Sequence, residues 1–280
     1  MNKVVEALDR ERGRLRNRRS GWVIGEGVFA HGHNYTGDFF REKTFLHALI
    51  LNATGRMPED RFCTWVGACH LCMSWPDPRI WCNTVASLAA SARTSPMTAT
   101  IAALAASQSS LYGTITLVGG IEFIEAALRA RKAGESIEQI LPALAQRVKG
   151  RWHIPGYLRP IADGDERITL MLELAESLGY EHGEHLQLAL EIERYLLETD
   201  GQSMNFAGYA SAFLADNGIS VQEGQQIFAA VVSSGATACY AEDIAKPAGH
   251  FLPLRCSDIE YSGPARRELP GHYGASREKK

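Results

Sequence analysis

The stretch from Arg151 to Arg167, RWHIPGYLRPIADGDER, holds the residues whose types and spacing are best suited to chemistry. A Pro-Gly turn leads into a loop that carries Arg159, and an Asp-rich helix start then ends on Arg167. An arginine guanidinium can hold a carboxylate through two parallel hydrogen bonds and can stabilise an oxyanion, but it cannot exchange protons near neutrality. Two simpler interpretations stay open: Arg159 on the surface after a turn, and Arg167 in an ion pair with Asp163 or Asp165.

Histidines are the candidates for proton transfer. His153 lies six residues before Arg159, where its imidazole would reach a cleft formed by the loop, unless it is a structural histidine. His31 and His33 occur in FAHGHNY, and this alternating spacing puts both on one face of an extended segment, as metal binding or acid–base chemistry requires. No third ligand is near them in the sequence, so a loop that lines a cleft is the alternative.

A glycine pair offers backbone donors. Gly119 and Gly120 precede the segment Glu122–Ala133, which has helical periodicity. A Gly-Gly loop before a helix leaves N–H groups free for a phosphate, a carboxylate or a thioester oxygen. A plain helix-entry turn is the competing interpretation.

The cysteines include one arrangement that superficially resembles a metal knuckle, Cys69-His70-Leu71-Cys72 with Cys63 nearby. A structural zinc site would need a second ligand pair, and the sequence has no second CxxC or HxxxH. The apolar neighbours in WVGACHLCMSW favour buried thiols on a helix. We therefore expect no metal site.

Composition describes an ordinary globular protein of 280 residues, with 45% hydrophobic and 22% charged residues. The net charge of -3 argues against binding to nucleic acid or to an anionic membrane. The basic cluster Arg10–Arg19 is interpreted as a solvated helix or arm. The first twenty residues lack an apolar core, and Thr84–Leu111 carries polar residues and Arg93, so we expect no signal peptide, no membrane span and a cytoplasmic location.

Apolar residues recur at three- and four-residue intervals along most of the chain, which predicts an all-α protein of ten or so helices. Gly134, Gly179 and Gly218 lie where helix C-caps are expected, and a short strand is expected only within Trp22–Phe29 and in the tail. The predicted helices are Thr44–Ala53, Pro58–Met73, Ile80–Ala92, Met97–Leu111, Glu122–Ala133, Ser136–Lys149, Asp165–Leu178, Glu184–Thr199, Phe206–Asn217 and Gly224–Asp243.

The chain is expected to divide near Gly150 and again near Ala245. Residues 1–150 and 245–280 would form a large helical body, and residues 151–244 a smaller helical domain. A cleft lined by both parts is the expected ligand site.

Six segments in order resemble landmarks of the citrate synthase superfamily. Arg151–Arg167 is similar to I-P-G-F-G-H-x-x-Y-x-x-x-D-P-R, and Ser234–Glu242 with Tyr261–Arg267 is similar to the closing helix and its Y-x-G-x-x-x-R signature. The other four are Gly37–Pro58, Ala86-Ser87 (R-x-x-A-S), Leu117–Ile121 (L-H-G-G-A) and Met204–Ala207 (N-x-D-F-x).

The resemblance implies a citrate synthase-like helical fold and carbon–carbon chemistry beside a coenzyme A thioester, with no bound cofactor. It places Val118 and Arg159 at the family's two histidine positions and Asn205 at its aspartate position. It assigns carboxylate binding to Arg167 and Arg267, the latter reaching a partner subunit's site in a homodimer. Two further arginines of the family are replaced, by Asn83 and Val232.

Three functional hypotheses follow. The first is a citryl-CoA lyase-like enzyme acting on an acyl-CoA and a carboxylic acid, in which Arg159 stabilises the enolate and His153 or His31 transfers the proton. The second is a catalytically inactive relative that binds a CoA ester or regulates an active homologue, because all three catalytic positions are altered. The third is unrelated chemistry at His31 and His33, since fold does not fix function.

Overall fold

The computed structural model describes residues 3–13, 17–109, 112–157, 159 and 164–267. The chain is all-α apart from two small antiparallel sheets, as predicted. Its α-helices are α1 (Lys3–Glu11), α2 (Phe40–Glu42), α3 (Phe45–Thr54), α4 (Asp60–Met73), α5 (Trp81–Ser91), α6 (Pro96–Ser107), α7 (Thr114–Lys132), α8 (Ile137–Leu144), α9 (Glu166–Ser177), α10 (Glu184–Asp200), α11 (Phe206–Asp216), α12 (Val221–Phe228) and α13 (Ser233–Ile244).

The helix ends follow local sequence signals. Ser220 and Glu223 form a capping box at the start of α12, and Asp165 caps α9 by accepting a hydrogen bond from the backbone N–H of Arg167. The three predicted C-cap glycines all have a positive φ: 94° at Gly134, 76° at Gly179 and 65° at Gly218.

Three predicted helices were wrong in extent, one of them Glu122–Ala133, since α7 already begins at Thr114. The helix predicted over Ser136–Lys149 ends at Leu144, soon after Pro142, and the chain then forms the hairpin of β4 (Gln146–Val148) and β5 (Arg151–His153). A proline inside a helix removes one backbone donor and so favours an early end. The helix predicted over Gly224–Asp243 is two helices, α12 and α13, which meet at a turn at residues 229–232.

The N-terminal strand prediction was right in place but incomplete. Residues 20–34 form a three-stranded meander of β1 (Ser20–Val23), β2 (Gly27–Ala30) and β3 (His33–Asn34). No strand occurs in the tail as far as Arg267, the last residue described. Residues beyond Pro270 lie outside the described part of the chain.

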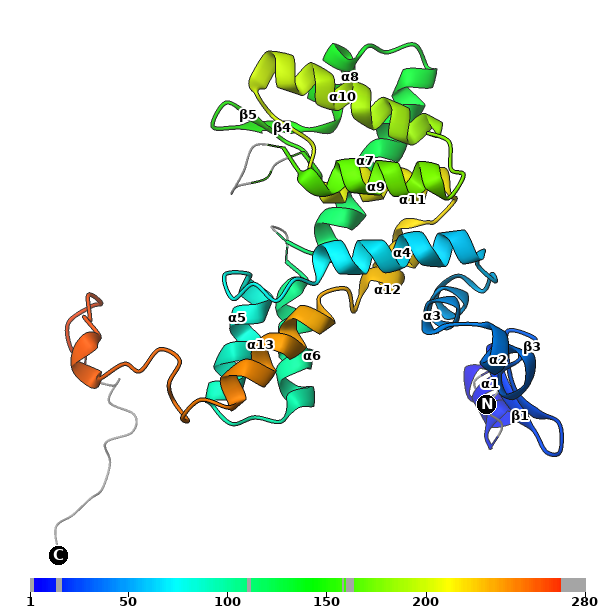
Figure 1. Cartoon of the computed structure of the whole chain (residues 1–280), viewed down its shortest axis with the longest axis horizontal. Helices are drawn as coiled ribbons and strands as arrows, with labels where there is room; N and C mark the ends of the chain where they lie inside the picture. Colours follow the sequence, from blue (N-terminus) through cyan, green and yellow to red (C-terminus); the bar gives the residue numbers. More distant parts are fainter. Residues whose placement is uncertain (1–2, 14–16, 110–111, 158, 160–163, 268–280) are drawn as a thin grey trace, which may run out of the picture.

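Most of the helices form two groups joined by α4 and α12, and α1 to α3 lie apart from both groups with the β1–β3 meander (Figure 1). The upper group contains α7 to α11, where α7 packs on α10 and α11, and the lower group contains α13 packed on α5 and α6. Both sets of contacts join helices from opposite sides of the boundaries expected near residues 150 and 245. The division into 1–150 with 245–280 and 151–244 stays a prediction.

An aromatic cluster holds α4 against α9 and α11. The Trp65 side chain is fully buried, stacks on Phe213 at a centroid distance of 4.0 Å, and donates its indole N–H to the Tyr209 hydroxyl at 3.2 Å. That hydroxyl donates to the backbone carbonyl of Met171 at 3.0 Å. Each buried polar atom of the cluster thus has a partner, which such burial requires.

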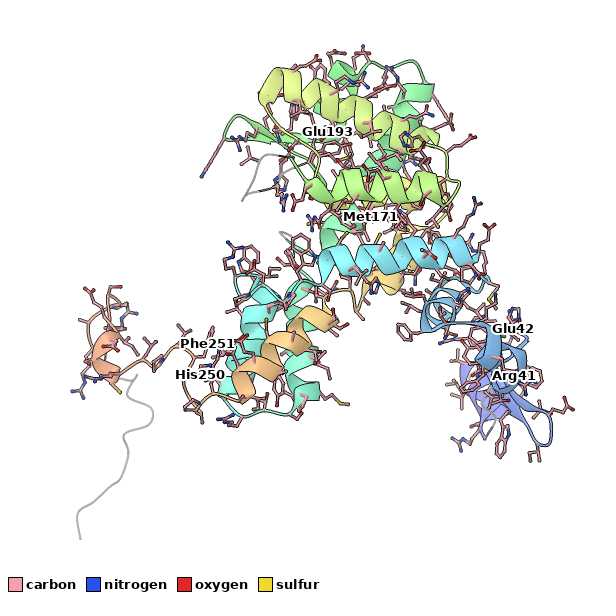
Figure 2. All side chains as sticks on the ribbon, in the orientation of Figure 1. Arg41, Glu42, Met171, Glu193, His250 and Phe251 are labelled. Atoms are coloured by element: carbon pink, nitrogen blue, oxygen red, sulfur yellow. The ribbon has the colours of Figure 1, made fainter. Side chains whose placement is uncertain are left out.

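The C-terminal tail leaves the body at α5. The backbone N–H of Phe251 donates to the Ser91 hydroxyl at 3.0 Å, and His250 contacts Asp243 of α13 at 3.2 Å (Figure 2). Residues 252–267 are exposed and run away from the helices (Figure 1). Within the described residues, no helix has the length and apolar character needed to cross a membrane.

Candidate functional site

The Pro155-Gly156 turn lies directly on the start of α11. The backbone N–H of Asn205 donates to the Gly156 carbonyl at 2.8 Å, and a Cβ atom on Gly156 would lie 2.5 Å from the Cα of Gly208. Gly156 also has a φ of 93°, a conformation that glycine adopts without strain. The turn therefore needs this glycine to bring the following loop against α11.

Asn205 is the N-cap of α11. Its side-chain oxygen accepts hydrogen bonds from the backbone N–H groups of Ala207, at 2.9 Å, and Gly208, at 3.4 Å. This capping role explains an asparagine at position 205 without any catalytic function. The assignment of the family's aspartate position to Asn205 stays a prediction.

Asp165 is the centre of the site. Its side chain is fully buried, and one oxygen accepts from the backbone N–H of Phe206 at 2.8 Å. Burial by itself raises the pKa of this carboxyl, but hydrogen bonds and charge from Arg167, the Phe206 N–H and the charge of Arg159 outweigh burial and lower it. Asp165 is therefore ionised at neutral pH.

Arg167 forms the predicted ion pair with Asp165. Nε donates to Oδ1 at 2.7 Å and Nη2 to Oδ2 at 2.6 Å, while Nη1 donates to the carbonyl of Cys72 at 3.2 Å. The guanidinium also lies 5.0 Å from the Phe206 ring centroid and 5.9 Å from that of Trp75. A guanidinium has five N–H groups, and no described residue accepts from the remaining one on each terminal nitrogen. Within the described residues, these two N–H groups remain available to a carboxylate.

Arg159 is not a surface residue: only 14% of its side chain is exposed. Its Nη2 donates to Glu166 at 3.2 Å, its Nη1 donates to the Gly164 carbonyl at 3.2 Å, and Nη1 lies 3.7 Å from Asp165. The hydrogen bond from Arg159, helped by the backbone N–H of Glu166, lowers the pKa of Glu166 to about 2. Asp163, the other predicted partner of Arg167, lies outside the described residues.

The loop Ser74–Asp77 forms hydrogen bonds with residues of both α5 and α13. The Ser74 hydroxyl accepts from the backbone N–H of Gly235 at 3.0 Å. The Asn83 amide donates to the carbonyls of Trp75, at 2.7 Å, and Asp77, at 2.9 Å. Asn83, Arg167 and the start of α13, where Val232 is buried, are thus gathered around one loop, although they lie far apart in the sequence.

The glycine pair is not a loop. Helix α7 begins at Thr114, so Gly119 and Gly120 lie inside it, beyond the first four N–H groups that a helix leaves unpaired. A Cβ on Gly120 would lie 2.3 Å from the Ser211 hydroxyl, and one on Gly119 would lie 2.9 Å from Pro155. The expectation of free backbone donors was wrong, because both positions serve close packing of α7 on α11 and on the turn. Val118, beside them, is half-buried.

The predicted histidine and tail residues are not joined to this cluster. His153 is exposed on β5, where it pairs with Gln146, and Arg267 is exposed in the tail; no described contact links either to Arg167. His31 has a φ of 48° at the turn after β2, so His31 and His33 do not alternate along one extended strand as predicted.

The cysteines of the knuckle-like motif lie on α4. Cys69 is buried, and burial lowers the pKa of the neighbouring His70, whose ring lies 5.7 Å from that of Phe228. All six cysteines are free thiols, and the described residues hold no group of three or more His, Cys, Asp or Glu side chains placed to bind a metal.

Two aromatic residues of the site gave no sequence signal. Trp75 flanks Arg167, and Tyr112 lies near enough for Arg167 to influence its titration. Burial, with Cys82 beside it, raises the pKa of the Tyr112 phenol, so its hydroxyl stays neutral at physiological pH. The sequence indicated Asp165 only as one of two aspartates that could pair with Arg167.

No protein-family model matches the chain, and no curated protein matches it in sequence. Among solved structures, citryl-CoA lyase from Hydrogenobacter thermophilus matches over 92% of this chain and 98% of its own, with a TM-score of 0.75 and 21% identity. ATP citrate lyase from Methanothrix soehngenii, in complex with citrate and coenzyme A, matches over 96% of this chain and 45% of its own, with a TM-score of 0.74 and 17% identity.

Citrate synthase from Thermotoga maritima matches over 84% of this chain and 61% of its own, with a TM-score of 0.59 and 16% identity. The protein therefore has the citrate synthase superfamily fold, as the ordered sequence landmarks predict.

Proposed function

We propose that this protein binds a coenzyme A thioester and a carboxylic acid, and makes or breaks a carbon–carbon bond as a citryl-CoA lyase-like enzyme. The observation that carries the proposal is the Asp165–Arg167 pair, in which the guanidinium keeps two N–H groups that no described residue accepts from. The fold supports it, since citryl-CoA lyase and an ATP citrate lyase in complex with citrate and coenzyme A are similar to this chain.

In the cleavage direction the substrate hydroxyl loses its proton and becomes a ketone as the carbon–carbon bond breaks. The bonding electrons pass to the α-carbon of the thioester as an enolate, which then takes up a proton; synthesis is the reverse. Arg159 is the proposed enolate-stabilising group and His153 the proposed proton carrier, with Asn205 as a hydrogen-bonding group only. Arg267 is proposed to supply a second carboxylate contact.

The proposal is tested by ligand-induced stabilisation followed by turnover. Coenzyme A, acetyl-CoA, citrate, oxaloacetate and malate are added singly and in pairs, and a ligand at about a hundred times its Kd adds about 2.7 kcal/mol to the free energy of unfolding. Arg167→Lys, which keeps the charge but loses the two-point geometry, is the matched variant. A stabilising CoA–acid pair that the enzyme also interconverts supports the proposal, and no stabilisation by any of them contradicts it.

A catalytically inactive, CoA ester-binding regulatory protein is the second candidate. The observation that favours it is the loss of proton-transferring groups at the family positions: Val118 is apolar, Asn205 is an uncharged amide, and Arg159 is paired with Glu166. Binding of a CoA ester without turnover in either direction would select this candidate.

We further propose that the protein works as a homodimer in the cytoplasm. Three large apolar side chains on α5 and α6 are exposed, namely Leu88, Met97 and Ile101. A groove of about 590 Å³ between α6 and α12 continues this surface. Apolar surface of this kind is usually covered in an assembly. Sedimentation of the purified protein tests the dimer, with Ile101→Glu expected to weaken it.

A further inference from the structure

A cavity of about 280 Å³ lies at the start of α4, away from the cluster around Asp165. It is lined by the turn that joins α3 to α4 and by the loops that follow α9 and α11. From Arg61 in this lining to Cys72, whose carbonyl accepts from Arg167, α4 runs for roughly 16 Å at 1.5 Å a residue. The cavity is therefore separate from the site described above.

The inner lining of this cavity is apolar. Ile50, Phe62 and Ile219 all line it, and each of these residues is at most 7% exposed. Covering such side chains with an apolar ligand removes apolar surface from water, which is favourable. The volume is just below the roughly 300 Å³ at which pockets for drug-sized molecules begin, so the cavity has room for a small molecule with an apolar body.

Arg56 lines the cavity with part of its guanidinium still unpaired. Its Nη2 donates to the Gly218 carbonyl at 3.2 Å and to Glu223 at 3.1 Å, which holds the group in place. No described residue accepts from its Nε or its Nη1, and the side chain is 56% exposed. Three N–H groups of this cation are therefore available to a ligand.

Arg61 and Tyr180 together form one wall of the cavity. The Arg61 guanidinium lies 4.4 Å from the centroid of the Tyr180 ring, a cation–π contact between two flat groups. Its Nε donates to Glu59 at 2.5 Å and its Nη1 to the Gly179 carbonyl at 3.3 Å. The wall is thus held in position by the protein, and a planar group can pack against it.

The four charged side chains around the cavity form two ion pairs, Arg56 with Glu223 and Arg61 with Glu59. Each carboxylate already accepts from an arginine, and Glu59 is 69% exposed to water. The donors that stay unpaired within the described residues are guanidinium N–H groups, which bind anions through charge-assisted hydrogen bonds. The bonds to the carbonyls that follow α9 and α11 do not use these groups, so helix capping alone does not account for them.

We propose that this cavity is a second binding site, which takes a small organic anion with a flat apolar body. The anionic group, a carboxylate or a phosphate, lies against Arg56, and the body lies on Ile50, Phe62 and Ile219. The site goes beyond the proposed function and does not depend on it, because none of these residues belongs to the cluster around Arg167.

The test measures the binding of four small molecules to the full-length protein by isothermal titration calorimetry: benzoate, phenyl phosphate, benzyl alcohol and inorganic phosphate. Benzyl alcohol keeps the flat body without the charge, and inorganic phosphate keeps the charge without the body. At least one of the two phenyl anions is expected to bind about tenfold more tightly than either control molecule. The tighter of the two identifies the anionic group as a carboxylate or a phosphate.

Two variants locate the anion. Arg56→Gln is expected to weaken binding of the tighter phenyl anion about tenfold, because it removes a charged donor. Arg167→Lys, in the other site, is expected to leave that binding unchanged. Arg129→Gln is the control for loss of an exposed arginine, since its side chain is 71% exposed on α7, and it should also leave binding unchanged.

Equal binding of the anion to wild type and Arg56→Gln would overturn the proposal, as would loss of binding in Arg167→Lys alone, which would place the anion near Asp165. Binding of benzyl alcohol or inorganic phosphate as tight as that of both phenyl anions would contradict the ligand class. Absence of binding by coenzyme A esters and acids would remove the proposed function and leave these expected results unchanged.

Discussion

Asp165 and Arg167 lie two residues apart at the start of α9, yet their side chains form a two-point ion pair with hydrogen bonds of 2.7 and 2.6 Å. The carboxylate is fully buried, and it also accepts from the backbone N–H of Phe206 at the start of α11. The pair therefore joins two helices and fixes the position of the Arg167 guanidinium between them.

Replacing Arg167 with glutamine is expected to lower the free energy of unfolding by about 3–5 kcal/mol, because Asp165 would be left buried without its main counter-charge. Urea unfolding measures the loss. Arg129→Gln is the control, since Arg129 is mostly exposed and lies 3.9 Å from Glu125, and its effect should stay within about 0.5 kcal/mol. Equal stability of the two variants would show that the buried pair contributes little.

Lowering the pH should reduce the free energy of unfolding through the protonation of Glu166. Its pKa is lowered from 4.5 to about 2 by the hydrogen bond from Arg159 and by its own backbone N–H. A carboxyl whose pKa falls on folding stabilises the folded state above its unfolded pKa, and this contribution is lost as the pH falls from about 4.5 to about 2. In Glu166→Gln, the slope of unfolding free energy against pH should decrease by up to about one proton in this range. An unchanged slope would contradict the Arg159–Glu166 pair.

Gly120→Ala should destabilise the packing of α7 on α11 by about 1–3 kcal/mol, because the new Cβ would lie 2.3 Å from the Ser211 hydroxyl. Combining it with Ser211→Ala removes the clashing oxygen and should recover part of that loss. Gly21→Ala, where no atom lies within 4 Å of the new Cβ, should change stability by less than about 0.5 kcal/mol. Additive effects of the two α7–α11 substitutions would contradict a direct contact.

One thiol should react rapidly with an alkylating reagent at pH 8. Cys256 is exposed, whereas burial raises the pKa of the other five thiols, that of Cys63 to about 11. Intact-mass spectrometry should therefore find one label on the native chain and six after unfolding. Rapid labelling of Cys69 or Cys72 in the native protein would contradict the burial that raises the pKa of these thiols.

Most helices were predictable, because a buried face imposes its three- and four-residue spacing on the sequence. The predictions for Thr44–Ala53, Glu184–Thr199 and Phe206–Asn217 agree with α3, α10 and α11 to within a residue. The secondary structure near Gly120 and near Lys149 was not predictable from the sequence. Whether a glycine pair opens a loop or lets two helices approach depends on a residue such as Ser211, more than ninety positions away.

The sequence by itself determined the all-α class and the order of family landmarks, since these depend on periodicity and motif spacing, and it offered Asp165 as one of two possible partners of Arg167. Only the tertiary structure decided that the Asn83 amide donates to the backbone of the Ser74–Asp77 loop, that Val232 is buried and that Trp75 lies beside Arg167. The physical reason is that hydrogen-bond partners and burial are set by segments that meet in space. Side-chain type alone does not say whether an amide faces a ligand or a backbone carbonyl.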